Sequence, residues 1–164
     1  MIGKKVQDAF NDQIQAELYS AYLYLAMAAQ FEDMNLPGFA GWMRVQAKEE
    51  VAHAMKFYAH VTERGGRVTL QAIDAPPAEW ASPLAAFQDA FKHEQKVTAL
   101  IDGLVRTAAE AGDNAAGVFL HWFVTEQVEE EASVDEVVQR LKRVKDAPHA
   151  LLMVDRELAR RGGE

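Results

Sequence analysis

The sequence contains no cysteine among its 164 residues, which excludes disulfide bridges, cysteine-ligated zinc sites and thiol catalysis. Basic residues are also few: 17 Lys and Arg stand against 25 Asp and Glu, so the net charge is -8 at pH 7. Nucleic-acid binding depends on basic side chains that neutralise phosphates, so we expect no nucleic-acid partner. An acidic surface attracts cations instead.

Long apolar runs are missing as well. The first residues, Met1 to Gln13, hold two lysines but lack the apolar segment of a secretion signal. The longest apolar run near the start, Ala21 to Ala29, is too short to cross a bilayer. We therefore expect no membrane partner and a cytoplasmic location. Hydrophobic residues make up 49% of the chain, enough for the core of a single domain over residues 1–164.

Proline and glycine are scarce, at 5 and 10 residues, and they divide the chain at few points. Between these points the apolar residues recur in steps of three and four, which is the period of an α-helix. Apart from Val68 to Leu70, no segment has the pattern of a strand. The sequence therefore predicts an all-α fold. Its helices are expected at about residues 4–33, 37–64, 83–111, 114–144 and 148–160.

The connection at residues 65–82 is unusually long for a link between helices. Fully extended, these residues reach roughly 55 Å at ~3.3 Å per residue, whereas a helix of about 28 residues is roughly 42 Å long. The connection can therefore run the whole length of a bundle, so that the helices on either side lie parallel. We predict a four-helix bundle with one long crossover and a short fifth C-terminal helix. Ser82 and Asp146 are the expected N-caps of the third and fifth helices.

Each of the four long apolar stripes is interrupted near its middle by polar side chains. A buried carboxylate is costly unless it is paired or bound to a metal ion. One such residue could mean that a helix face is wrongly assigned, but a set on every helix points to a common cause. The interrupting residues are Glu17, Glu50 with His53, Glu94, and Gln127 with Glu130.

The spacing of these residues is the same in both halves of the chain. Glu17 and Glu50 are 33 residues apart, and so are Glu94 and Gln127. Adding 77 to positions 17, 50 and 53 gives 94, 127 and 130. In each antiparallel helix pair the polar groups then face each other at similar height. The pattern predicts a pseudo-two-fold polar site at the centre of the bundle.

The residue types at this site favour metal binding. Residues three apart share a helix face, so Glu50 and His53 can reach one ion, as can Gln127 and Glu130. Carboxylate oxygens with one imidazole suit iron or manganese, whereas zinc would bind without redox chemistry. A shared carboxylate would hold two ions about 3.5–4 Å apart. Glu50 is the candidate bridge, because His53 completes one side.

This matched set resembles the ferritin family over essentially the whole chain, although Glu-x-x-His alone is a weak signal. Together with Trp122 and the crossover length, it is similar to the bacterial non-haem ferritins in particular. The resemblance implies a ferritin-like bundle that stores iron and has ferroxidase activity. Two Fe(II) ions would be oxidised by dioxygen or hydrogen peroxide, and Fe(III) would pass to a mineral core. The shell would be a hollow homo-oligomer, a 24-mer.

The resemblance also implies roles for individual residues. The ligands of the two irons would be Glu17, Glu50 and His53 for the first, and Glu50, Glu94 and Glu130 for the second. Gln127 would lie close by as a hydrogen-bonding partner or weak ligand. Tyr24 would hydrogen-bond a ligand carboxylate and could supply an electron, although an ordinary core tyrosine is the alternative.

A third iron site is implied at Glu49, Glu126 and Glu129, for which a solvated acidic patch is the other interpretation. Two departures from related families also matter. Bacterioferritins have Glu-x-x-His in both halves, where the second half here has Gln127-x-x-Glu130. They bind haem through a methionine at the position of Val51, so haem is disfavoured.

Two other functions remain open. A diiron oxidase or peroxidase of the rubrerythrin type would use the same bundle centre without storing iron, although that family normally adds a cysteine-rich domain that this chain lacks. A substrate oxidase would also need a pocket beside the site. Alternatively, a helical interaction module would pair its central acids with buried Arg or Lys. The inward stripes contain no such basic residues at those levels.

Overall fold

The computed structural model describes residues 1–144 and 147–162, and over these residues it is helical without a strand. The elements are α1 (Lys4–Asp33), α2 (Pro37–Glu63), α3 (Pro83–Glu110), α4 (Asn114–Val144), α5 (Pro148–Leu158) and the 3₁₀-helix η1 (Ala159–Gly162). The predicted all-α class is confirmed. None of the helices in the described ranges is long and apolar enough to cross a membrane.

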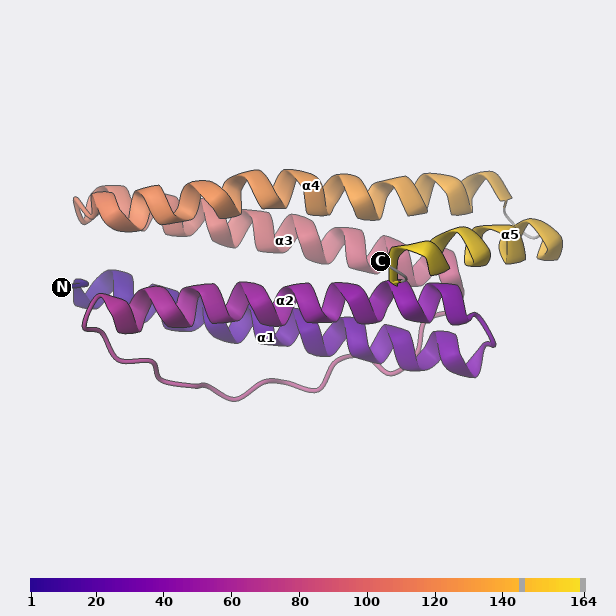
Figure 1. The fold of residues 1–164 in the computed structure, drawn as a ribbon, viewed down its shortest axis with the longest axis horizontal. Coiled ribbons are helices and arrows are strands. Elements are labelled where there is room, and N and C mark those ends of the chain that lie inside the picture. Colours follow the sequence, from indigo (N-terminus) through magenta and orange to yellow (C-terminus); the bar gives the residue numbers. More distant parts are fainter. Residues whose placement is uncertain (145–146, 163–164) are drawn as a thin grey trace.

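The four long helices form two antiparallel pairs, α1 with α2 and α3 with α4, whose tight turns lie at opposite ends of the bundle (Figure 1). The crossover between Arg64 and Ser82 runs along the length of the bundle, so α2 and α3 point in the same direction (Figure 1). This is the expected topology with one long crossover. It brings the middle of every long helix to the same level.

Left-handed residues end three of the long helices. Asn35, Gly65 and Gly112 have φ values of 55°, 70° and 63°. After each of them, a backbone amide donates to a carbonyl five residues earlier, as in the bond from Gly66 to Val61 of 2.9 Å. These bonds satisfy carbonyls that a helix end leaves free. The positions of the turns therefore set the lengths of the helices.

Side chains cap the starts of the second helix pair. Ser82 Oγ accepts a hydrogen bond from the Ala85 amide at the start of α3. Asp113 Oδ1 accepts from the Ala116 amide at the start of α4, and it also pairs with Arg64 at the end of α2. The pair from Arg64 to Asp113 ties the two helix pairs together at one end. Asp146, the expected cap of α5, lies outside the described residues.

Two separate apolar clusters fill the bundle, one towards each end. The members of one cluster include Phe31, Phe39 and Phe87, and those of the other include Phe10, Phe57 and Phe123. Along each long helix, the residues of one cluster precede the central polar residues and those of the other follow them. The polar site therefore lies between two dry layers that exclude water from both sides.

The fifth helix docks on the start of α2. Asp155 is buried in α5, and its Oδ1 accepts a hydrogen bond of 3.0 Å from the Phe39 amide, which has no partner within α2. A Cβ atom added to Gly38 would lie 1.7 Å from the carbonyl oxygen of Asp155. Only glycine allows this close approach of α5.

We expect Gly38→Ala to destabilise the protein by about 1–3 kcal/mol, because the new methyl group must push α5 away from α2. Gly41→Ala is the matched control in the same helix, since a Cβ atom there meets nothing within 4 Å. The control should gain roughly 0.5–1 kcal/mol from the better helix propensity of alanine. Urea denaturation at one protein concentration measures both, and equal stability of the two variants would contradict the tight docking.

Candidate metal centre

One glutamate from each long helix is buried at the middle of the bundle. Glu17, Glu50, Glu94 and Glu130 expose only between 1 and 4% of their surfaces. They lie on the inward stripes because each replaces an apolar residue in the repeat of three and four. The predicted convergence of acids from four helices is therefore present in the structure.

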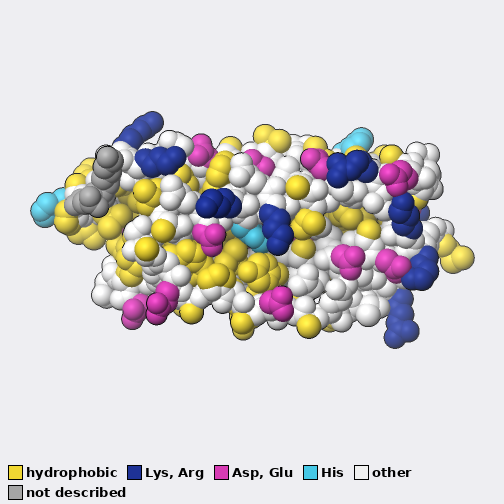
Figure 2. All heavy atoms as spheres, turned by 180° about the vertical axis from the view of Figure 1, so that it is seen from behind, with side chains coloured by type: hydrophobic (Ala, Val, Ile, Leu, Met, Phe, Trp, Pro, Cys, Tyr) yellow, Lys and Arg dark blue, Asp and Glu magenta, His cyan; other side chains and the backbone are white. Residues whose placement is uncertain are grey.

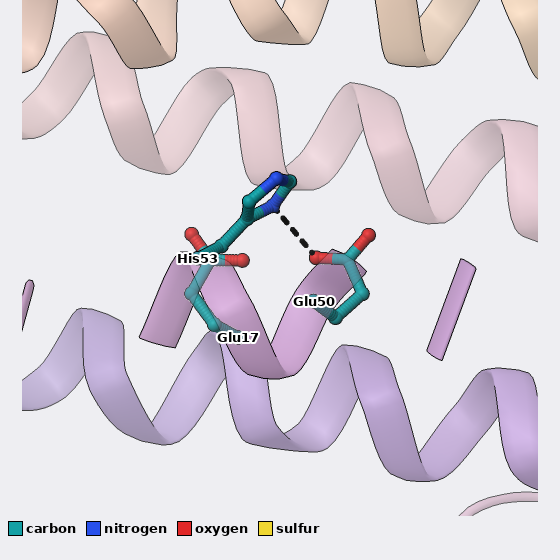
Figure 3. Close-up of side chains that lie close together, drawn as sticks. All are labelled: Glu17, Glu50 and His53. Carbon is teal, nitrogen blue, oxygen red and sulfur yellow. Dashed lines mark ion pairs between the residues drawn. The ribbon is translucent and has the colours of Figure 1, made fainter. Parts of the chain in front are cut away.

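Two ligand clusters share one carboxylate. Glu17, Glu50 and His53 can each offer a ligand atom within 4.8 Å of the others, and so can Glu50, Glu94 and Glu130. Figure 3 shows the first cluster, in which side chains from α1 and α2 point toward one another. Glu50 belongs to both clusters, which is the geometry needed for a carboxylate that bridges two ions.

The donor set fits a hard or borderline cation. Glu17 Oε2 is buried without a hydrogen-bond partner among the described residues, as an oxygen that could bind an ion would be. Apart from His53, every donor in the two clusters is a carboxylate oxygen. Oxygen ligands with one imidazole suit iron or manganese.

Burial and mutual repulsion raise the pKa values of three glutamate carboxyl groups at this site. Burial, followed by the charge of Glu50, raises the pKa of Glu94 from 4.5 to about 8. The same two causes raise the pKa of Glu130 to about 8 and that of Glu17 well above its ordinary value. In the metal-free protein at neutral pH, protons therefore neutralise part of the charge. Cations that bind here must displace them.

His53 is placed by both charge and packing. Its Nδ1 lies 3.3 Å from Glu50 Oε2, the contact drawn as a dashed line in Figure 3. Burial lowers the pKa of His53, but hydrogen bonding to Glu50 and the nearby carboxylates outweigh it, and the net pKa is raised. The rings of Trp122 and Phe123 lie edge-on to the imidazole, with centroids 5.4 and 6.0 Å away.

Tyr24 and Gln127 both donate hydrogen bonds to Glu94. The Tyr24 hydroxyl is fully buried and donates to Glu94 Oε1. Gln127 Nε2 lies 3.3 Å from Glu94 Oε2 and also 3.3 Å from Thr98 Oγ1. The structure thus places Tyr24 on a carboxylate of the second cluster, as the resemblance implied. Gln127 contacts that cluster through its amide nitrogen, which is a hydrogen-bond donor and not a ligand atom.

The three acids expected at a third site do not form one cluster among the described residues. Glu126 Oε1 is 3.8 Å from His53 Nε2, and Glu126 belongs to a cluster with His53 and Glu130. Glu49 instead pairs with Arg161 of η1 at 2.7 Å, and Glu129 is exposed. The guanidinium of Arg161 also lies 4.4 Å from the ring centroid of Trp42. A basic partner from the C-terminal segment therefore neutralises Glu49.

Two buried amides support the site in ways that the sequence analysis missed. Gln13 Nε2 donates to Glu17 Oε1 at 2.9 Å, and Gln46 Nε2 donates to Glu50 Oε1 at 3.1 Å. In both cases the glutamine lies four residues before the glutamate, on the same helix face. The repeated Gln-x-x-x-Glu spacing on the inward stripes is the signal that could have identified them.

A groove of about 990 Å³ lies beside the site, between α1, α3 and the crossover. Gln13 and His93 are among its lining residues. His93 is partly buried, and its Nε2 lies 2.7 Å from Ser20 Oγ. Figure 2 views this side of the molecule, where side chains of both charges are scattered among hydrophobic ones. The side chain of Gln13 lies between the groove and Glu17, because it lines the groove and donates a hydrogen bond to Glu17.

The chain is similar to known ferritins over nearly its whole length. The family model for the ferritin-like domain matches residues 7–144. The bacterial non-heme ferritin of Bacteroides fragilis (strain 638R) is 42% identical over 161 residues, which cover 98% of this chain and 100% of that protein. That of Staphylococcus aureus (strain MRSA252) is 37% identical, covering 98% of this chain and 97% of the relative.

A solved structure gives the same result for the fold. The open pore ferritin from the hyperthermophilic archaeon Archaeoglobus fulgidus superimposes with a TM-score of 0.96 at 51% sequence identity. The match covers 97% of this chain and 98% of that chain.

The raised carboxyl pKa values predict how stability depends on pH without metal. Between 4.5 and about 8, the folded protein keeps protons on Glu94 and Glu130 that the unfolded chain has released. The free energy of unfolding should therefore fall as pH rises through this window, by roughly 1 kcal/mol per pH unit for each carboxyl. Denaturation of chelator-treated protein between pH 5 and 8 measures this slope.

Glu94→Gln should make this slope shallower and raise the stability of the metal-free protein at pH 8, because the amide carries no charge to bury. The control is Glu63→Gln, which changes an exposed glutamate of α2. If both variants kept the wild-type slope, the proposed cause of the pH dependence would be wrong.

Proposed function

This chain belongs to the ferritin family, and we propose that its bundle centre is the diiron site at which Fe(II) is oxidised. Iron storage with iron oxidation is the function that the family relationship supports. The observation that carries the assignment of the site is the sharing of Glu50 between two buried ligand clusters. Iron is both substrate and cargo here, because the oxidised metal moves on to storage.

The first iron is assigned to Glu17, Glu50 and His53, and the second to Glu50, Glu94 and Glu130. The burial of the four carboxylates supports this assignment, because charged groups removed from water need compensating positive charge. Two Fe(II) ions also displace the protons that the raised pKa values hold there. Gln127 and Tyr24 orient Glu94 through their hydrogen bonds.

The electron balance of the reaction requires an oxidant that takes two electrons. Each Fe(II) loses one electron, so one pair reduces dioxygen and two protons to hydrogen peroxide, or reduces hydrogen peroxide and two protons to two waters. Protons released by the carboxyl groups are available for either reaction.

We further propose that the chains form a hollow 24-mer shell in the cytoplasm, with no haem at the position of Val51. Several apolar side chains on α4 and α5 are exposed, and an interface between chains would bury them, which supports a homo-oligomer. They include Val118, Val128, Leu152 and Met153. A third iron near Glu49, Glu126 and Glu129 remains part of the proposal, with Glu126 the member that lies beside the two assigned sites, because Glu49 is paired with Arg161.

Aerobic loading with Fe(II) separates storage from a diiron oxidase or peroxidase of the rubrerythrin type. We expect iron far above two ions per chain, held in a large particle of uniform size. Iron analysis after gel filtration, together with light scattering, measures both quantities. A plateau at about two ions per chain would favour the diiron enzyme without storage, and no bound iron would favour a helical interaction module.

Removing a ligand should slow the first phase of oxidation while the helices stay folded. We expect Glu50→Ala and His53→Ala to lower the initial rate at least about tenfold, with Glu50→Ala the more severe because that carboxylate serves both ions. Stopped-flow absorbance measures the rate, and circular dichroism checks the helices. Glu63→Ala, on the exposed face of α2, is the control. Wild-type kinetics in both site variants would refute the assignment.

A further inference from the structure

Gln46 connects the two halves of the metal centre. It lies in α2, one turn before Glu50, and its exposed fraction is 0%. Its amide nitrogen donates to Glu50 Oε1 at 3.1 Å and to Glu130 Oε2 at 2.5 Å. Glu50 lies in α2, which belongs to the first helix pair, and Glu130 lies in α4, which belongs to the second. Gln46 therefore bridges the interface between the pairs.

The fold does not need an amide at this level. The equivalent position in the second half, 77 residues later, is Phe123, which packs in one of the apolar clusters. The carbonyl oxygen of Gln46 is buried and has no hydrogen-bond partner among the described residues. A buried polar atom without a partner destabilises the folded state. An apolar residue would avoid this penalty. The two hydrogen bonds that Gln46 donates are therefore what distinguishes glutamine from an apolar residue at this position.

Gln13 offers an internal comparison. It has the same residue type and the same spacing of four from a proposed ligand carboxylate, but among the described residues it donates to Glu17 alone. Glu130 has one side-chain donor within the described ranges, and that donor is Gln46. Glu50 has a second polar contact besides Gln46, since its Oε2 lies 3.3 Å from His53 Nδ1. Glu130 depends most on Gln46.

We propose that Gln46 is a positioning residue that sets the relative placement of Glu50 and Glu130 and so determines how tightly the second ion binds. This rests on the proposed diiron function. Gln46 donates to one oxygen of each carboxylate, Glu50 Oε1 and Glu130 Oε2, and so limits how the two groups can turn about their side-chain bonds. Without Gln46, Glu130 loses its donor, and the ion assigned to Glu50, Glu94 and Glu130 loses a preorganised ligand.

The test compares Gln46→Met with Gln13→Met in the assembled protein, since methionine is close in size to glutamine but donates no hydrogen bond. Anaerobic titration with Co(II), followed by its visible absorption, measures ions per chain and their affinities without any oxidation. We expect Gln46→Met to weaken the second ion about 10–100-fold and leave the first nearly unchanged. Gln13→Met should weaken the ion of Glu17 instead. The Fe(II) concentration for half-maximal initial oxidation should rise in Gln46→Met.

The outcomes separate this inference from the proposed function. If the wild-type protein binds no Co(II) in the bundle, the diiron assignment fails. If the wild-type binds two ions and Gln46→Met binds both equally well, or if both methionine variants have the same binding pattern, the role of Gln46 fails alone. Thermal denaturation and particle size check that each variant assembles. Should Gln46→Met not assemble, Gln46→Asn replaces it, because an amide shorter by one methylene cannot reach both carboxylates. Wild-type affinities in Gln46→Asn overturn the inference.

Discussion

The structure depends on the burial of four carboxylates in one layer of the bundle. Without compensating charge this layer is destabilising, because each ionised group loses hydration and repels the others. The metal-free protein compensates with protons, as the raised pKa values of Glu94 and Glu130 indicate, and with amide and hydroxyl donors. Under the proposed assignment, cations would replace the protons without a rearrangement of the helices, because the candidate ligand atoms already lie within 4.8 Å of one another.

The apolar clusters on either side of the layer make this arrangement possible. They hold the four helices together at both ends, so the centre does not have to contribute stability of its own. They also keep water away from the carboxylates, which strengthens their interaction with a bound ion. The left-handed turn residues fix the helix lengths and so align the polar residues of all four helices.

Much of this could be predicted from the sequence, for physical reasons that also explain what could not. Helical periodicity, the sparse turn residues and the crossover length led to the all-α bundle, and the repeat at 77 residues identified Glu17, Glu50, Glu94 and Glu130 as central. The partner of Glu49 was missed because Arg161 is 112 residues away, and no periodic pattern reports such a contact.

The two halves of the site share a spacing but differ in their side chains, and the difference matters more than the repeat. The first half has an imidazole, His53, and amide donors four residues before both of its glutamates. The second has Glu130 where the first has His53, and alanine and phenylalanine where the first has Gln13 and Gln46. Its carboxylates also accept hydrogen bonds from the first half, Glu94 from Tyr24 in addition to Gln127, and Glu130 from Gln46. Under the proposed diiron assignment, these unequal ligand sets would give the two ions different affinities, although the backbone that holds them is pseudo-symmetric.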